Sequence, residues 1–249
     1  MEWDRGVLER MVRKLELRAK LSDGDRKALL ALPHTVKVLE AATYIIREGD
    51  PPVHCAVVLS GFAYRQKITG EGGRQILGIH VPGDMLDLQN LLLSVSDHNV
   101  QTLTRGEVAF IPRTALHKLI AERPGVAHAF FIDTLVDASI FREWLLNVGR
   151  RDSRTRLAHL LCEFALRLEA VGLAEDHGYE LPMTQEQLAD ATGLTPVHVN
   201  RMLKTLDAEG LVEREKRRVR IPDWQRMRHV ADFSERYLHL DQRAGMVAI

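Results

Sequence analysis

The sequence predicts an α+β protein in which an N-terminal β-barrel is followed by a long helix and a small C-terminal helical domain. Three observations carry this prediction. Residues 35–112 contain short apolar runs separated by Gly, Pro and Asp, as in an all-β barrel or sandwich. An apolar helical pattern runs from 126 to 148 without Pro or Gly. Two further helical patterns meet at a glycine near residue 193.

Composition narrows the class of protein. A chain of 249 residues fits one large domain or two small ones. With 34 Lys and Arg against 34 Asp and Glu the net charge is zero, which excludes an overall basic coat but not a local basic patch. The charged N-terminus and the lack of any apolar run of about 20 residues predict a soluble cytoplasmic protein without membrane contact.

The two cysteines, Cys55 and Cys162, are too few for a disulfide framework or a zinc ribbon. Either residue is a candidate redox sensor. We favour the interpretation that both cysteines are small buried apolar residues, one in a strand and one in a helix. His159 and Cys162 lie three apart on a helical face, but two ligands make a poor metal site, so they too are expected in the core.

The N-terminal part is expected to pair two helices with the barrel. Residues 3–32 carry apolar side chains at helical spacing, and the stretch 22–25 predicts a turn between two short helices. The glycine cluster at 70–73 is read as the tip of a hairpin. It lacks the Lys-Ser/Thr pair and the helix of a phosphate-binding loop.

The long helix is expected to begin at Pro124 and to end at 147–149, with Gly149 as a flexible joint. Its apolar surface is too large for a solvated connector, so it either packs on the barrel or meets a copy of itself across a two-fold axis. A second helix follows from Ser153 to about Val171. The predicted domains are 1–123, 124–149 as helix and hinge, and 150–249 with a C-terminal tail.

Residues 182–224 contain a helix-turn-helix pattern. Thr184 and Gln187 form a capping box for a helix over 185–191. Gly193 stands at the corner, and Thr195 with Pro196 begins a second helix that runs to about Glu209. The residues spaced to be buried between the two helices are Leu188, Ala189, Leu194, Val199, Met202 and Leu206. Caps, corner and apolar spacing agree, which makes the prediction specific.

The exposed side of the second helix indicates DNA as the partner. Val197, Arg201 and Lys204 form one stripe; arginine can bond guanine O6 and N7, and a valine can contact a thymine methyl group. Residues 211–221 alternate around a basic tip and predict a β-hairpin wing. Over 211–228 seven bases face three acids, a balance of +4 that suits a phosphate backbone. The predicted DNA contacts are Thr184, Thr195, Val197, His198, Asn200, Arg201, Lys204, Lys216, Arg217 and Arg218.

The order of these parts resembles the CRP/FNR superfamily of bacterial transcription regulators. The stretch TQEQLADATGLTPVHVNRMLKTLDAEGLV carries most of the resemblance, with support from REGD at 47–50, the turn at 59–61 and PGD at 82–84. The resemblance implies a cyclic-nucleotide-binding-type barrel of double-stranded jelly-roll form with flanking helices, a dimerisation helix and a winged helix-turn-helix. It also implies a homodimer on a palindromic operator, half-sites about one helical turn apart, and RNA polymerase as a partner.

Departures from the family pattern bear on the ligands. Val197 replaces the glutamate that members commonly carry four residues before Arg201, which leaves one base preference open. The cyclic-AMP branch has Gly-Glu and Arg-Ser where this chain has Asp87-Leu88 and His98-Asn99, and Asp87 would repel a cyclic phosphate. Two cysteines are too few for the four ligands of an iron–sulfur cluster. Asp87 and Gln89 stand where the haem branch places its Cys and His. No cofactor is therefore expected.

The sequence therefore leaves two alternatives for regulation: an unidentified effector or no effector. The candidate effector residues are Asp87, Gln89, His98 and Asn99, although each is also an ordinary polar loop residue. The sequence contains no GxSxG, Walker, HExxH or GxGxxG motif, so no enzyme activity is predicted. The alternative function is a small-molecule sensor that acts through protein contacts, with the winged helix as an interaction module.

Overall fold

The computed structural model describes residues 6–240, and the chain divides into two compact units. Among these residues, the first unit contains 6–65, 79–139 and 238–240, and the second contains 66–78 and 140–237. The start of the predicted N-terminal helical pattern, at 3–5, and the end of the predicted C-terminal tail, at 241–249, lie outside the described residues.

Two antiparallel N-terminal helices begin the first unit: α1 (Glu9–Arg18) and α2 (Asp23–Leu30). The stretch 22–25 was predicted as a turn between them, but it is the cap and first turn of α2. The Ser22 hydroxyl accepts a hydrogen bond from the backbone N–H of Asp25, whose carboxylate accepts one from the N–H of Ser22. A further helix, α3 (Arg113–Glu122), was not predicted.

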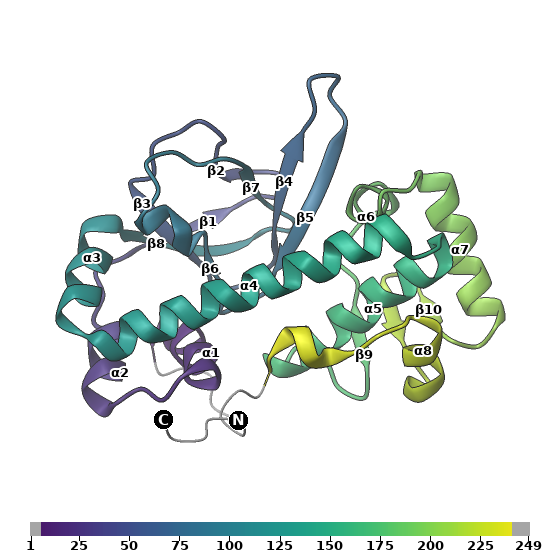
Figure 1. Cartoon of the computed structure of the whole chain (residues 1–249). Coiled ribbons are helices and arrows are strands. Elements are labelled where there is room, and N and C mark those ends of the chain that lie inside the picture. The colour runs from purple at the N-terminus through teal and green to yellow at the C-terminus, as the bar shows by residue number, and fades with distance from the viewer. Residues whose placement is uncertain (1–5, 241–249) are drawn as a thin grey trace. The chain divides into compact units, whose positions relative to one another are not determined.

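The barrel is formed by two four-stranded sheets, which confirms the predicted α+β class (Figure 1). Strand order is β1-β8-β3-β6 in one sheet and β2-β7-β4-β5 in the other. Strand β3 pairs antiparallel with both β6 and β8, so that Val57 lies opposite Met85 and Ala109. The glycine cluster at 70–73 lies between β4 and β5, as predicted for a hairpin tip. The strands are β1 (Thr35–Leu39), β2 (Tyr44–Ile46), β3 (His54–Val58), β4 (Ala63–Ile68), β5 (Arg74–His80), β6 (Met85–Leu86), β7 (Asn99–Thr102) and β8 (Gly106–Pro112), with a 3-10 turn η1 (Leu88–Leu91).

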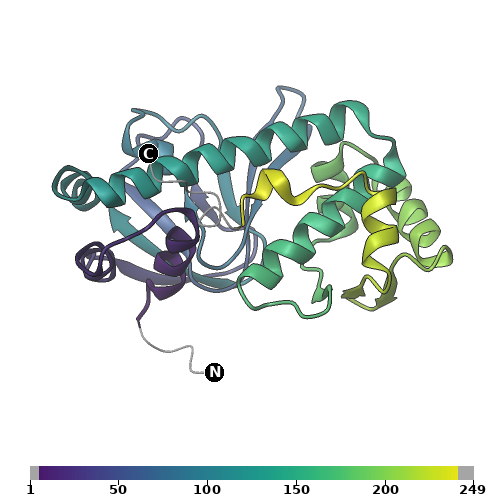
Figure 2. The same ribbon diagram turned by 60° about the horizontal axis from the view of Figure 1, so that its bottom comes forward.

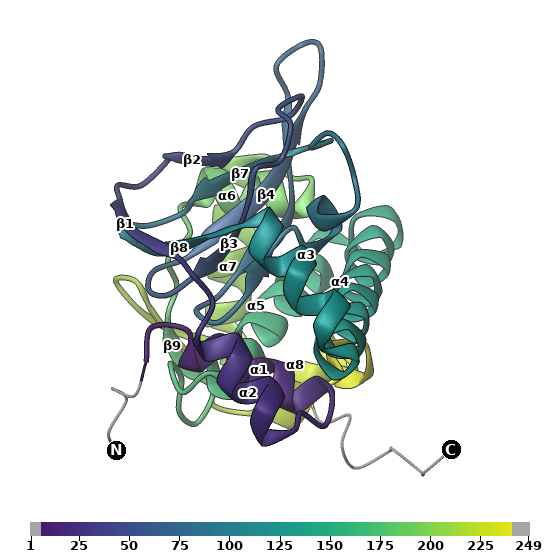
Figure 3. The ribbon, with the colours of Figure 1, turned by 90° about the vertical axis from the view of Figure 1, so that its left-hand side faces the viewer.

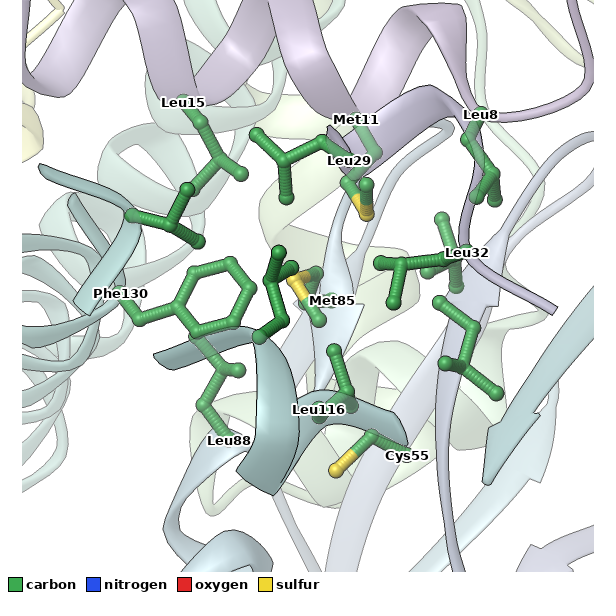
Figure 4. Close-up of a cluster of buried hydrophobic side chains, with 14 of the residues drawn as sticks. Leu8, Met11, Leu15, Leu29, Leu32, Cys55, Met85, Leu88, Leu116 and Phe130 are labelled. Atoms are coloured by element: carbon green, nitrogen blue, oxygen red, sulfur yellow. The ribbon is translucent and has the colours of Figure 1, made fainter. Parts of the chain in front are cut away.

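The helices of the first unit gather at one side of this barrel (Figure 3). Their apolar faces meet in one cluster with side chains from α1, α3 and the start of the long helix, among them Met11, Leu116 and Phe130 (Figure 4). Each fully buried side chain of this size contributes about 1.5–3 kcal/mol. This cluster fixes the beginning of the long helix on the barrel.

The long helix α4 (Pro124–Arg150) starts at the predicted residue and ends slightly later than predicted. Gly149 does not stop it, because the helix continues through this residue to Arg150. The two compact units divide within α4, between Ser139 and Ile140.

The second unit is a helical domain with a three-stranded sheet of order β10-β11-β9. Helix α5 contacts α6, α7 and α8, and Figure 2 shows α8 in yellow beside it. The predicted helices and hairpin are present, whereas β9 and α8 were not predicted. The elements are α5 (Ser153–Ala170), β9 (Gly178–Glu180), α6 (Gln185–Thr192), α7 (Pro196–Ala208), β10 (Glu213–Glu215), β11 (Arg218–Arg220) and α8 (Trp224–Val230), followed by a 3-10 turn η2 (Glu235–Leu238).

A buried polar cluster lies inside the second unit. The carboxylate of Glu163 accepts hydrogen bonds from Trp144 Nε1 at 3.0 Å and from the Tyr237 hydroxyl at 2.8 Å. His159 lies beside them, with Nδ1 3.2 Å from the carbonyl oxygen of Ala231. Burial lowers the pKa of His159 to about 4. His159 and Cys162 are both buried, in agreement with the expectation that they belong to the core.

Candidate nucleic-acid interface

The two helices of the helix-turn-helix are fixed by their caps. Thr184 Oγ1 accepts from the backbone N–H of Gln187 at 3.2 Å, and the Gln187 side chain accepts from the N–H of Thr184 at 2.9 Å. Thr195 Oγ1 accepts from the N–H of His198 at 3.3 Å. Gly193 has φ +64°, a left-handed conformation that favours glycine and turns the chain between the helices. The predicted capping box, corner and second cap are therefore all present.

Packing between the helices follows the predicted pattern with two corrections. Leu188, Ala189, Val199 and Leu206 are buried as predicted. Met202 is only half-buried, and Leu203, one position further along α7, is fully buried instead. Leu194, also predicted to be buried, is half-buried. The sequence did not predict a hydrogen bond at the end of α6, where Arg156 Nη1 donates to the carbonyl oxygen of Thr192 at 2.8 Å.

The solvent face of α7 presents the predicted stripe. Val197 is 81% exposed, and Arg201 and Lys204 are exposed beside it. This face borders a shallow hollow lined by Gln185, Pro196, Val197, Asn200, Arg201, Lys204, Thr205 and Ala208. Gln185 was missed by the sequence analysis, although its position directly after the Thr184 cap places it at the start of α6. The hollow therefore brings the starts of both helices to one surface.

Arg201 is held by a neighbour on its own helix. Its Nη2 donates to Nε2 of His198 at 2.6 Å, one turn earlier. His198 is half-buried, and its Nε2 lies 3.5 Å from the hydroxyl of Ser153 on α5. The geometry places His198 behind Arg201 and leaves the guanidinium at the surface.

The predicted wing is the hairpin of β10 and β11, in which Glu213 lies opposite Arg220 and Glu215 opposite Arg218. Lys216 occupies the turn with φ +54° and is exposed, as is Arg218. Arg217, the third predicted phosphate contact on the hairpin, is also bonded within the second unit. Its Nη2 donates to the carbonyl oxygen of Pro182 at 2.5 Å, which ties the hairpin to the segment before α6. Carboxylates also neutralise part of the hairpin's charge, since Arg220 Nη1 lies 3.1 Å from Glu213.

Three of the four candidate effector residues come together in the barrel. Asp87 Oδ2 lies 2.8 Å from His98 Nε2, and Gln89 Nε2 donates to Asp87 Oδ1 at 3.1 Å. Asn99 is separate: its side chain accepts from the backbone N–H of Glu48 at 3.0 Å. The sequence analysis missed Arg65, which donates from Nη2 to Asp87 Oδ1 at 2.8 Å. Arg65 lies between Tyr64 and Gln66 in the predicted strand, and nothing in this pattern distinguishes it from an exposed arginine.

These residues do not fit a cyclic nucleotide. A cyclic phosphate needs a fixed cation and bare backbone N–H groups. Arg65 and His98 are already paired with the Asp87 carboxylate, whose side chain is completely buried. A phosphate beside Asp87 would meet a buried negative charge.

Other candidate chemistry has little support in the described part of the chain. Burial raises the pKa of the Cys55 thiol to about 12 and that of Cys162 above its usual value, so neither is a reactive thiolate near neutral pH. Residues 6–240 contain no group of three or more His, Cys, Asp or Glu side chains arranged to hold a metal ion. Within the same residues, no helix has the length and apolar character needed to cross a membrane.

The fold and this surface together define a protein of the helix-turn-helix class with a cyclic-nucleotide-binding-like barrel. Residues 155–230 match the family model of the Crp-like helix-turn-helix domain, and residues 36–123 match that of the cyclic nucleotide-binding domain. The chain is 29% identical over 209 residues to the transcriptional activator protein FnrL of Cereibacter sphaeroides, covering 82% of this chain and 84% of that protein. It is 30% identical over 203 residues to the probable transcriptional regulator flp of Lacticaseibacillus casei, covering 81% and 89%.

Among solved structures, FixK2 from Bradyrhizobium japonicum superposes with a TM-score of 0.75 at 24% identity, covering 82% of this chain and all of that one. This similarity concerns the fold alone. The chain belongs to the CRP/FNR superfamily of transcriptional regulators.

Proposed function

We propose that this CRP/FNR-type regulator binds a palindromic DNA operator as a homodimer and reads it with α7. The observation that carries the proposal is the exposed stripe of Val197, Arg201 and Lys204 beside a basic hairpin. Arginine bonds guanine through two parallel hydrogen bonds in the major groove, and a valine contacts a thymine methyl group. We assign Arg201 to a guanine and Val197 to a neighbouring methyl group.

The other predicted contacts divide into residues that reach the DNA and residues that support the surface. Asn200 and Lys204 border the same hollow as Arg201 and shape base preference or reach adjacent phosphates. Lys216 and Arg218 are exposed on the hairpin and bind phosphates without sequence preference. Thr184, Thr195 and His198 support the surface, since each has a hydrogen bond within the second unit. Arg217 supports the hairpin through Pro182.

The homodimer is proposed from the exposed side of α4. Phe131, Leu135, Ala138, Arg142 and Leu145 are all exposed and follow one another at spacings of four and three residues. This is the spacing of a two-helix coiled-coil seam. Leu145 is 70% exposed, an apolar area that a second copy of α4 would bury. A two-fold dimer presents two reading helices, which is why a palindrome with half-sites about one helical turn apart is expected.

Selection from a pool of random DNA duplexes at moderate salt tests the proposal. A palindrome with half-sites roughly 10 bp apart is expected. No enrichment of any sequence would contradict it and favour the alternative, a sensor that acts through protein contacts. RNA polymerase as a partner rests on family membership and is tested separately by transcription from a promoter that carries the selected site.

The dimer is tested by sedimentation of Leu145→Glu. The introduced charge should prevent burial of the seam, so this variant is expected to sediment as a monomer and to lose operator binding. Leu92→Glu is the matched control, because Leu92 is 80% exposed in the barrel and outside α4. Equal behaviour of the two variants would exclude α4 as the interface.

A further inference from the structure

The carboxylate of Asp87 is completely buried and takes part in four hydrogen bonds. Oδ1 accepts from Arg65 Nη2 at 2.8 Å, from Arg65 Nε at 3.2 Å and from Gln89 at 3.1 Å, while Oδ2 is 2.8 Å from His98 Nε2. Both oxygens are therefore engaged by side chains of the barrel. Burial alone would raise the pKa of Asp87, but the His98 hydrogen bond and the Arg65 charge hold it well below its usual range.

The backbone at this residue is unusual for an aspartate. Asp87 has φ +56°, a left-handed conformation that favours glycine. The family resemblance aligns this position with the glycine of a Gly-Glu pair. The chain thus keeps a glycine-like backbone here and adds a carboxylate to it. Such a conformation persists only where its surroundings hold it, which the four hydrogen bonds do.

The two side chains that meet this carboxylate have no spare capacity for an added anion. His98 lies between two carboxylates, with Nε2 2.8 Å from Asp87 and Nδ1 2.6 Å from Asp97, so both of its ring nitrogens are engaged. Arg65 is 5% exposed and bonds Asp87 through two of its nitrogens.

The third nitrogen of Arg65 extends the cluster to α4. Nη1 donates to Asp137 Oδ2 at 2.8 Å. Asp137 follows Leu135 and precedes Ala138, two residues of the proposed seam. One guanidinium therefore joins strand β4 and the Asp87 carboxylate to the helix that carries the proposed dimer interface. Planar guanidinium groups suit this role because they bond two carboxylates in fixed directions.

We propose that Asp87 is a built-in anion, which holds α4 through Arg65 and Asp137 so that the protein binds its operator without a cyclic nucleotide or other anionic effector. The side chain provides from within what an anionic ligand would provide from solution: a negative charge between Arg65 and His98. This inference rests on the proposed operator binding only where it concerns regulation. The internal anion itself is testable without DNA.

The sharpest test replaces the anion. Asp87→Gly suits the left-handed backbone and removes the atoms that acetate can return. The variant should unfold at a lower temperature than the natural protein, and sodium acetate should raise its Tm, because a ligand bound only to the folded state stabilises it. Sodium chloride at the same ionic strength should not do so. Operator affinity should fall at least about tenfold and return with acetate.

Two controls isolate the effect. Glu40→Gly removes the carboxylate of an exposed barrel ion pair, Arg105–Glu40, and should show no response to acetate. Asp137→Ala leaves Asp87 and its partners in place and removes only the acceptor that Arg65 Nη1 meets on α4. Its side chain is 41% exposed, so the variant should fold, and its operator affinity should fall about tenfold.

Several outcomes would overturn the proposal. One is a folded Asp87→Gly protein whose Tm does not respond to acetate. Another is a natural protein whose Tm rises with cyclic AMP or that needs cyclic AMP to bind its operator. If Asp87→Gly does not fold, Asp137→Ala decides, and unchanged operator affinity would refute the link to α4. If the natural protein has no operator, the proposed function fails, whereas the acetate effect on Tm still decides whether Asp87 is an internal anion.

Discussion

The barrel and the surface of α7 treat an arginine in opposite ways. Arg65 is 5% exposed and bonded to two carboxylates, whereas Arg201 is exposed and bonded to a ring nitrogen of His198. The first guanidinium has its charge neutralised within the fold. The second lies at the surface, where its charge is available to the proposed DNA partner. The contrast shows that the environment of a charged side chain, and not its type, separates a structural role from a binding role.

The largest effect is expected from Arg65→Met. Removing one partner of a buried ion cluster leaves Asp87 uncompensated, which should lower the free energy of unfolding by about 3–5 kcal/mol. Urea denaturation measures this change. Arg105→Met removes an exposed arginine from the same barrel and should cost under about 1 kcal/mol. Similar losses in the two variants would contradict the structural role assigned to Arg65.

The interior of the second unit should respond to acid. His159 has a pKa of about 4 when folded and about 6.5 when unfolded, so the unfolded chain binds more protons between these values. Stability from this residue is complete above pH 6.5 and is lost as the pH falls toward 4, by about 1.4 kcal/mol per pH unit. Burial also lowers the pKa of His80 in the first unit, so the stability that this residue contributes is likewise lost as the pH falls.

His159→Gln separates the two contributions. It should make the curve of unfolding free energy against pH less steep between pH 4 and 6.5, whatever its effect on stability at pH 7. An unchanged slope would show that His159 remains protonated in the folded protein.

On the open surface, Arg201→Ala should cost about 1–3 kcal/mol in operator affinity and relax the preference at one position of each half-site. Repeating the selection from random duplexes measures both. Stability should change little, because Arg201 is exposed. A variant that selects the same sequence as the natural protein would remove Arg201 from base recognition.

The smallest effect is expected from Lys216→Ala. Loss of one phosphate contact should weaken binding to all duplexes alike, and the slope of log affinity against log salt should fall by about one. Lys118→Ala on α3 provides an exposed lysine in the first unit as control. A loss that depends on the DNA sequence would assign Lys216 to a base.

The sequence predicted the helix-turn-helix geometry well because its determinants are local. Caps at Thr184 and Thr195 and the corner at Gly193 lie within a few residues of the helices they shape. The barrel cluster was missed because Arg65 is 22 residues from Asp87 and 72 from Asp137. Such pairings depend on strand register, which alternation does not define. Helix α3 was missed for a local reason: Pro112 precedes it without a side-chain cap.

The exposure of Val197 bears on how the DNA preference of this regulator changes during evolution. Its side chain touches little of the protein, so its replacement carries almost no folding cost. Changing the second base of a valine codon gives Ala, Gly or an acidic residue, and an acidic residue can accept a hydrogen bond from cytosine. Under the proposed contact of Val197 with a base, a single nucleotide change would alter operator preference, while the scaffold that presents this position stays the same.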